Sequence, residues 1–304
     1  EKTFRKGRTI AEQILAAAPW LDPEELIFLR QTRACHTGAT GPHIFFPGML
    51  PDISAVQTIR TLFPDVQERL TSHADRILAH RFDLLGSGEC FLGKNIDWHR
   101  DFRSGYRWDP RTPCHRITIP YGKADIKIPW ELSRFQHLAV LGQAYRLTGD
   151  ERYTREFIAQ VSDWISENPA GYGVNWHCTM DVAIRASNWI LAWFLFSDSP
   201  LLSTSFRHLL TKSLYRHGRH IFHHLEFSPS LTANHYLADI AGLFYIGEIF
   251  CCTSRGRKWR RFAHREMIRE MRKQVNPDGS DFEASTCYHR LVLEMFFFPT
   301  FLRV

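Results

Sequence analysis

Helical segments recur from about residue 130 onward with a repeat of about 50 residues, a length typical of repeated helix hairpins. The first helix of each repeat is expected to begin near Trp130, Asp181, Asn234 and Ser285. A single hairpin cannot bury its apolar face alone, so neighbouring hairpins must stack against one another. An open solenoid and a closed (α/α) toroid both satisfy this requirement, and both are all-α.

Two kinds of helix alternate within the repeat. Ile184–Phe196 and Ile240–Phe250 are apolar nearly all round, which indicates burial on several sides. Their partners, His208–Leu225 and Lys258–Lys273, carry charge along one face. Buried inner helices covered by amphipathic outer ones are typical of a toroid, so we predict an all-α, incomplete (α/α) toroid over residues 129–304. The expected helices are Trp130–Leu147, Tyr153–Ile165, Asp181–Phe196, Phe206–Leu225, Tyr236–Cys251, Lys258–Val275 and a last one from about Ser285.

Residues 1–128 have a different character and are expected to form an irregular lead-in that packs on the toroid. Helices are predicted at about Thr9–Ala18, Pro23–Thr32 and Asp65–Arg81. The segment Phe82–Lys127 is rich in Gly, Pro, Asp and aromatic residues, which predicts a long loop region with short strands at most.

The charge balance narrows the class of partner. Lys and Arg number 38 against 32 Asp and Glu, so the formal net charge is +6 and anionic partners are favoured. A nucleic-acid reader would need a continuous basic stripe, whereas the arginines here are interleaved with acidic residues. No apolar stretch reaches the ~20 residues of a membrane span, and no signal peptide is visible. We therefore expect neither nucleic acid nor a membrane as a partner.

The N-termini of all inner helices should lie at one end of the toroid. Four successive repeats place hydrogen-bonding, titratable or aromatic side chains at that end: Trp130, Glu131 and Arg134; Trp176, Asp181 and Arg185; Asn234 and His235; Tyr288, His289 and Arg290. One polar residue at a helix N-terminus is ordinarily a cap. Four sets in register, including two tryptophans and two histidines, predict a functional cleft.

The deeper repeats suit β-elimination from a uronic acid. That reaction needs a group that neutralises the carboxylate, a base for the α-proton and an acid for the leaving oxygen. Asn234 and His235 can donate hydrogen bonds to the carboxylate and stabilise the developing dianion. Tyr288 can transfer the proton if the neighbouring His289 and Arg290 lower its pKa.

The other side chains of the predicted cleft suit an acidic sugar chain. Tryptophans can stack on sugar faces, and arginines can hold carboxylates or sulfates through paired hydrogen bonds. We predict that an acidic polysaccharide is the substrate. The predicted substrate-binding residues are Trp130, Glu131, Arg134, Trp176, Asp181, Arg185, His289 and Arg290.

An ordered set of motifs resembles the heparinase II/III family of polysaccharide lyases. The motifs are Pro129-Trp130-Glu131-x-x-Arg134, Asn175-Trp176, Asp181-x-x-x-Arg185-x-x-Asn188, Asn234-His235-Tyr236, and Asp278-Gly279-Ser280 leading to Tyr288-His289-Arg290. The resemblance covers most of the chain from about Gly93 to the end. It implies that an (α/α) toroid is followed by a large antiparallel β-sandwich, with the substrate between the two.

The resemblance also implies roles for single residues. Asn234 and His235 take the carboxylate-neutralising role, Tyr288 the proton-transfer role, and Arg290 a contact with a substrate carboxylate. No cofactor is implied, and a bacterial periplasmic or secreted location is expected. The chain ends at Val304 without a β-rich segment, so the expected β-sandwich partner is missing from it, and the fragment alone is expected to bind substrate without turning it over.

Two other functions stay open at this stage. A glycoside hydrolase on the same fold would use two carboxylic acids, and Glu131 and Asp181 both belong to the predicted cleft. A helical-repeat module could instead grip an acidic glycan without cutting it.

A metal site is not expected from the sequence. His217, His220, His223 and His224 have spacings that could hold a metal ion, but no H-E-x-x-H motif is present. We interpret this cluster as a solvated, basic helix face. No C-x-x-C pair occurs among the seven cysteines, which argues against a zinc ribbon.

Overall fold

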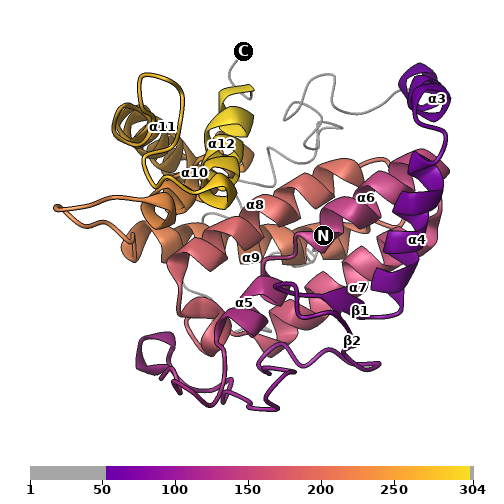
Figure 1. The fold of residues 1–304 in the computed structure, drawn as a ribbon, viewed down its shortest axis with the longest axis horizontal. Helices are drawn as coiled ribbons and strands as arrows, with labels where there is room; N and C mark the ends of the chain where they lie inside the picture. Colours follow the sequence, from indigo (N-terminus) through magenta and orange to yellow (C-terminus); the bar gives the residue numbers. More distant parts are fainter. Residues whose placement is uncertain (1–52, 302–304) are drawn as a thin grey trace, which may run out of the picture. The chain divides into compact units, whose positions relative to one another are not determined.

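The structure is a computed structural model that describes residues 53–301 (Figure 1). The helices predicted at 9–18 and 23–32 lie outside the described residues. The α-helices are α3 (Ile53–Leu62), α4 (Val66–Leu78), α5 (Lys127–Ser133), α6 (His137–Thr148), α7 (Glu151–Glu167), α8 (Thr179–Leu195), α9 (Thr204–His223), α10 (Asn234–Ile249), α11 (Ser254–Gln274) and α12 (Thr286–Phe301). Short elements are the strands β1 (Arg81–Asp83) and β2 (Glu89–Phe91) and the 3₁₀ turns η2 (Cys114–Arg116) and η3 (Val174–Trp176).

The helices pair as the repeat predicts. Helices α6 and α7, α8 and α9, and α10 and α11 form successive hairpins, and α6, α8, α10 and α12 contact one another in that order. Every residue of α10 except His235 and Glu248 is buried, as an inner helix requires. The predicted all-α class and the alternation of inner and outer helices are therefore confirmed.

Close contact between α8 and α10 depends on one glycine. A Cβ atom at Gly242 would lie 2.8 Å from the Cβ and 2.9 Å from the carbonyl oxygen of Ala183. Those distances are shorter than van der Waals contact, so the missing side chain lets the two backbones approach. This approach places the N-terminal residues of α8 and α10 next to each other.

One predicted helix is broken in two. Trp130–Leu147 was expected to be continuous, but Phe135 has a φ of 60° and separates α5 from α6. Its ring is completely buried and stacks on Trp98 with centroids 5.1 Å apart, while Trp189 contacts it edge-on at 5.5 Å. Burial of this aromatic ring offsets the cost of a left-handed backbone, which helical periodicity does not reveal.

The residues before α5 form the predicted mixture of loops and short strands. β1 and β2 pair antiparallel, with Phe82 opposite Cys90. Helix α4 packs against α6 and α7, and all described residues belong to one compact unit, Thr40–Val304. The domain boundary near residue 128 stays a prediction. No helix among residues 53–301 is both long and apolar enough to cross a membrane.

Candidate active site

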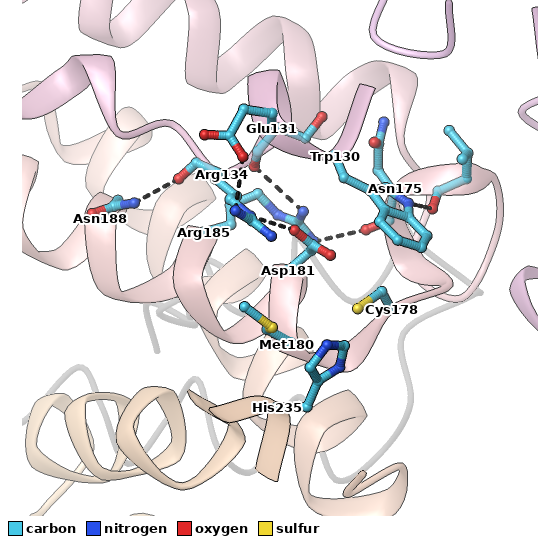
Figure 2. A network of polar contacts seen from close by, with 12 residues as sticks. Trp130, Glu131, Arg134, Asn175, Cys178, Met180, Asp181, Arg185, Asn188 and His235 are labelled. Atoms are coloured by element: carbon cyan, nitrogen blue, oxygen red, sulfur yellow. Dashed lines mark hydrogen bonds and ion pairs between the residues drawn. The ribbon is translucent and has the colours of Figure 1, made fainter. Parts of the chain in front are cut away.

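Side chains from α5, α8 and the start of α10 meet at the end of the inner helices (Figure 2). Arg134, just after α5, lies 2.7 Å from a carboxylate oxygen of Glu131 and 2.5 Å from one of Asp181. The Asp181 side chain is 2% exposed, so its charge is compensated within the protein. Burial opposes the charge on Arg134, but Asp181 and Glu131 outweigh it and raise the arginine pKa.

This ion-pair network bears on the hydrolase alternative. Glycoside hydrolysis needs one carboxylic acid that keeps its proton and a second carboxylate. Glu131 and Asp181 both accept hydrogen bonds from the same guanidinium, that of Arg134. The two carboxylates that a hydrolase would use are thus both engaged within the protein, and the arrangement does not favour hydrolysis.

Arg185 lies in the core and not at the surface of the site. It is 0% exposed, and its guanidinium donates to His217 Nε2 at 2.9 Å and to the carbonyl of Asn175 at 3.1 Å. It also stacks over Trp164 at 4.1 Å, and burial lowers its pKa to about 9. The predicted substrate contact by Arg185 is wrong because no part of the side chain is available to a ligand.

Trp176 is likewise buried. It is 1% exposed, and its indole donates to the carbonyl of Asn168 at 3.2 Å. The turn η3 directs the ring inward, between Trp164 and His217. A sugar cannot stack on this face, so the prediction for Trp176 is wrong too.

Contrary to the prediction from the sequence, the histidines of α9 do not all lie on a solvated helix face. His217 is 0% exposed and accepts the hydrogen bond from Arg185. Burial lowers the pKa of His220 to about 3, and its ring contacts Trp176 edge-on. Only His223 and His224 are exposed as expected. The inward-facing pair fills space beneath the site as neutral imidazoles.

Trp130 is the tryptophan that keeps a partly exposed face. Its indole donates to the carbonyl of Val174 at 2.9 Å, and its ring stacks on His177 at 6.0 Å with a 22° interplanar angle. It packs against a buried cluster that includes Trp108 and Ile126. The ring is therefore held rigidly at the rim of the site.

His235 is the exposed histidine at the start of α10. Its side chain is 53% exposed, and Nδ1 lies 3.2 Å from Glu226 Oε1. The hydrogen bond to this carboxylate raises the pKa of His235, although burial acts in the opposite direction. The imidazolium form is thus favoured, and its Nε2–H remains as a second donor.

Glu226 was missed by the sequence analysis. Burial would raise its pKa, but the hydrogen bonds from His235 and from the Met180 backbone N–H (2.8 Å) outweigh burial and lower it. Its own N–H donates to Asp239 Oδ2 at 2.7 Å. Asp239 is 0% exposed, and burial raises its pKa to about 9, so it is protonated at neutral pH. Glu226 lies in the loop before α10 and belongs to none of the sequence motifs. Its closeness to His235 in the folded chain is what identifies it as a site residue.

Asn234 binds a carboxylate in this structure. Its side-chain Nδ2 lies 2.9 Å from both oxygens of Glu283, and its backbone N–H donates to one of them at 3.1 Å. The N-terminus of α10 therefore provides side-chain and backbone donors to an anion, as helix N-termini commonly do. Glu283 in turn connects this end of α10 to the segment before α12.

The three predicted site residues of α12 differ in exposure and in their contacts. Tyr288 is 47% exposed on the first turn. The His289 side chain accepts a hydrogen bond from the Asp281 N–H at 3.2 Å and so stabilises the local turn. Arg290 has an 83% exposed side chain that pairs with Glu294 at 3.1 Å. Helix α12 packs on α10, but no hydrogen bond between described residues joins Tyr288 to Asn234 or His235.

Two curated proteins are similar to the chain over part of their length. The heparin-sulfate lyase of Pedobacter heparinus is 25% identical over 252 residues, which cover 81% of this chain and 34% of that protein. The heparin-sulfate lyase of Bacteroides stercoris is 29% identical over 193 residues, which cover 57% of this chain and 28% of that protein. The chain thus spans about a third of the length of these relatives.

Solved structures share the fold. A heparan sulfate lyase from Pedobacter heparinus matches with a TM-score of 0.61 and 22% identity, over 96% of this chain and 41% of that one. An alginate lyase in complex with a tetrasaccharide matches with a TM-score of 0.51 and 17% identity, over 87% of this chain and 74% of that one. These likenesses identify the fold as an (α/α) toroid. Residues 32–300 match the family described as Heparinase II/III N-terminus, and the chain therefore belongs to the heparinase II/III family.

Proposed function

We propose that this chain is the helical part of a polysaccharide lyase that cuts uronate-containing chains by β-elimination. The observation that carries the proposal is the pair of donors at the start of α10. His235 is exposed and has a pKa raised by its hydrogen bond to Glu226, and its neighbour Asn234 already holds a carboxylate. Family membership and the names of the two curated relatives support the same reaction class.

In this proposal, Asn234 and His235 neutralise the uronate carboxylate. Removal of the α-proton spreads negative charge onto that carboxylate, and donors fixed in advance stabilise the resulting dianion most effectively. The two carboxylate oxygens of Glu283 stand in for those of the substrate, which would exchange with them at Asn234. The partial positive charge of the α10 N-terminus adds to the effect.

Tyr288 is the proposed proton-transfer residue, as base, acid or both. Its half-exposed position on α12 leaves the phenol accessible to a ligand. Trp130 supplies a rim surface for a sugar ring, and the exposed Arg290 supplies a cation for a neighbouring acidic group. Glu131, Arg134 and Asp181 support these residues as a mutually compensated network.

The complete protein is proposed to act with a second domain outside the cytoplasm. The curated relatives are about three times as long as the region matched here, so we propose that a β-sandwich domain completes the site. Acidic polysaccharides are met outside bacterial cells, and we propose a periplasmic or secreted location on that ground. The proposed substrate class is a glycosaminoglycan or a related uronate polymer.

Ultraviolet absorbance tests the proposal directly. Elimination creates a C=C bond conjugated to the uronate carboxylate, and hydrolysis does not. The full-length protein should raise the absorbance of at least one acidic polysaccharide, with heparan sulfate first and alginate next. Reducing ends without absorbance would mean hydrolysis, and binding without either signal would mean a non-catalytic module.

Tyr288→Phe should abolish the absorbance increase, because the variant lacks the phenolic proton and its acceptor oxygen. The matched control is Tyr172→Phe, which removes a hydroxyl of similar exposure, 45% against 47%, away from α12. A Tyr288→Phe protein as active as the control would remove Tyr288 from the mechanism.

A further inference from the structure

A second set of ligating atoms surrounds His235. The sulfur of Cys178, a carboxylate oxygen of Glu226 and an imidazole nitrogen of His235 all lie within 4.8 Å of one another. Among the described residues, this is the one such group of three. Cys178 immediately precedes α8, so the approach of α8 and α10 brings together residues that are far apart in sequence (Figure 2).

The separations are close to those of a metal centre. Zinc binds thiolate sulfur at ~2.3 Å and imidazole or carboxylate atoms at ~2.0–2.2 Å, so neighbouring ligands of a tetrahedral site lie roughly 3.3–3.7 Å apart. Cys178 Sγ is 3.8 Å from Glu226 Oε2, and His235 Nδ1 is 3.2 Å from Glu226 Oε1. Small rotation of the half-exposed His235 would shorten the remaining edge, from sulfur to imidazole.

The donors also select the kind of ion. Thiolate and imidazole favour zinc and similar transition metals over magnesium or calcium, which prefer oxygen ligands. Glu226 is held in place by the Met180 N–H at 2.8 Å, so one ligand is already oriented. Three protein ligands with one open position are typical of zinc sites that exchange a fourth ligand with solvent.

We propose that Cys178, Glu226 and His235 form a three-ligand binding site for Zn²⁺ or a similar divalent transition metal ion. On binding, metal–sulfur, metal–nitrogen and metal–oxygen bonds replace bonds to water in the hydrated ion. The Cys178 thiol proton and the His235 Nδ1 proton pass to solvent, and the fourth position keeps a water molecule. Because the proposed lyase reaction also needs His235, we expect the bound ion to inhibit the enzyme reversibly.

Cobalt(II) is the probe, because thiolate ligation gives an intense charge-transfer absorption that carboxylate and imidazole ligation lack. The reduced, metal-free protein should bind one equivalent of Co²⁺ with this absorption, and Zn²⁺ should displace it. Cys178→Ser should eliminate the charge-transfer band. The matched control, Cys90→Ser, alters another free cysteine on β2 and should retain it.

His235→Gln keeps the test valid if Cys178→Ser does not fold, because the His235 side chain is half exposed and its replacement disturbs the core less. The variant lacks one of the three ligands, so its Co²⁺ affinity should fall. Loss of a residue that only supports a ligand lowers metal affinity ~10–100-fold, and loss of a ligand should cost at least as much. A wild-type protein without the charge-transfer band, or a band that survives in Cys178→Ser, overturns the proposal. No sugar enters the titration, so this failure is distinct from failure of the lyase assay.

Discussion

Arg134 shows how a residue suited to bind substrate can instead hold the site together. Its guanidinium compensates Asp181, which is 2% exposed, and Glu131, which is 19% exposed. Removing one partner of a buried ion pair leaves an uncompensated charge, and that costs more free energy than the pair itself contributes. The main role of Arg134 is therefore to stabilise the site.

Arg134→Met should lower the free energy of unfolding by about 3–5 kcal/mol, because the buried Asp181 carboxylate loses its partner. Chemical denaturation measures the change. Arg81→Met is the control, since Arg81 and Glu89 form an exposed pair with 51% and 42% exposed side chains and should contribute little. The double variant Arg134→Met/Asp181→Asn should regain part of the loss, and no recovery would contradict the charge argument.

Packing of α8 on α10 brings together site residues that lie on these helices and on the loops that precede them. Helices α8 and α10 touch at Gly242, and this contact keeps Met180 within hydrogen-bond distance of Glu226. An added side chain at this contact would push α8 and α10 apart and separate their N-termini. The packing of these two helices therefore controls the geometry of the site.

Gly242→Ala should destabilise the protein by about 1–3 kcal/mol, the typical cost of overpacking, even though alanine favours helices. Thermal unfolding measures the shift. Gln143→Ala on α6 is the control, because Gln143 is exposed and truncation to alanine adds no atom to the helix surface. A Gly242→Ala protein as stable as this control would show that α8 and α10 separate without cost.

At the scale of the whole molecule, His80 connects the lead-in to the helical hairpins. Its Nε2 lies 2.9 Å from Glu156 on α7, and its Nδ1 lies 2.9 Å from the carbonyl of Gly93. Both ring nitrogens face acceptors, so the imidazolium form fits best, and the hydrogen bond to Glu156 raises the pKa of His80.

This attachment should depend on pH. Because the folded-state pKa is raised above the ordinary 6.5, the stabilisation is fully present below 6.5 and is lost as pH rises through the folded-state value. His80→Asn, which tolerates the positive φ of 51° at this position, should lower the melting temperature by on the order of 2–4 °C at acidic pH. The difference from wild type should shrink at alkaline pH, and a difference independent of pH would contradict the assignment.

Local patterns in the sequence predicted much of the fold. Helical periodicity located the helices from α7 to α12, because burial of one or all faces leaves a regular trace along the chain. The same register placed Asn234 and His235 at the start of an inner helix. The break at Phe135 was not predicted, because a buried ring and not a local signal causes it.

Which side chains face a ligand was decided by tertiary structure. Arg185 and Trp176 have the residue types of a sugar site, yet both are buried against Trp164 of α7 and His217 of α9. Glu226 carries no sequence signal, yet the folded chain sets it against His235 and Cys178. Periodicity reports whether a residue lies on a buried helix face. Only the three-dimensional arrangement of helices determines which polar groups find partners inside the protein and which remain available outside it.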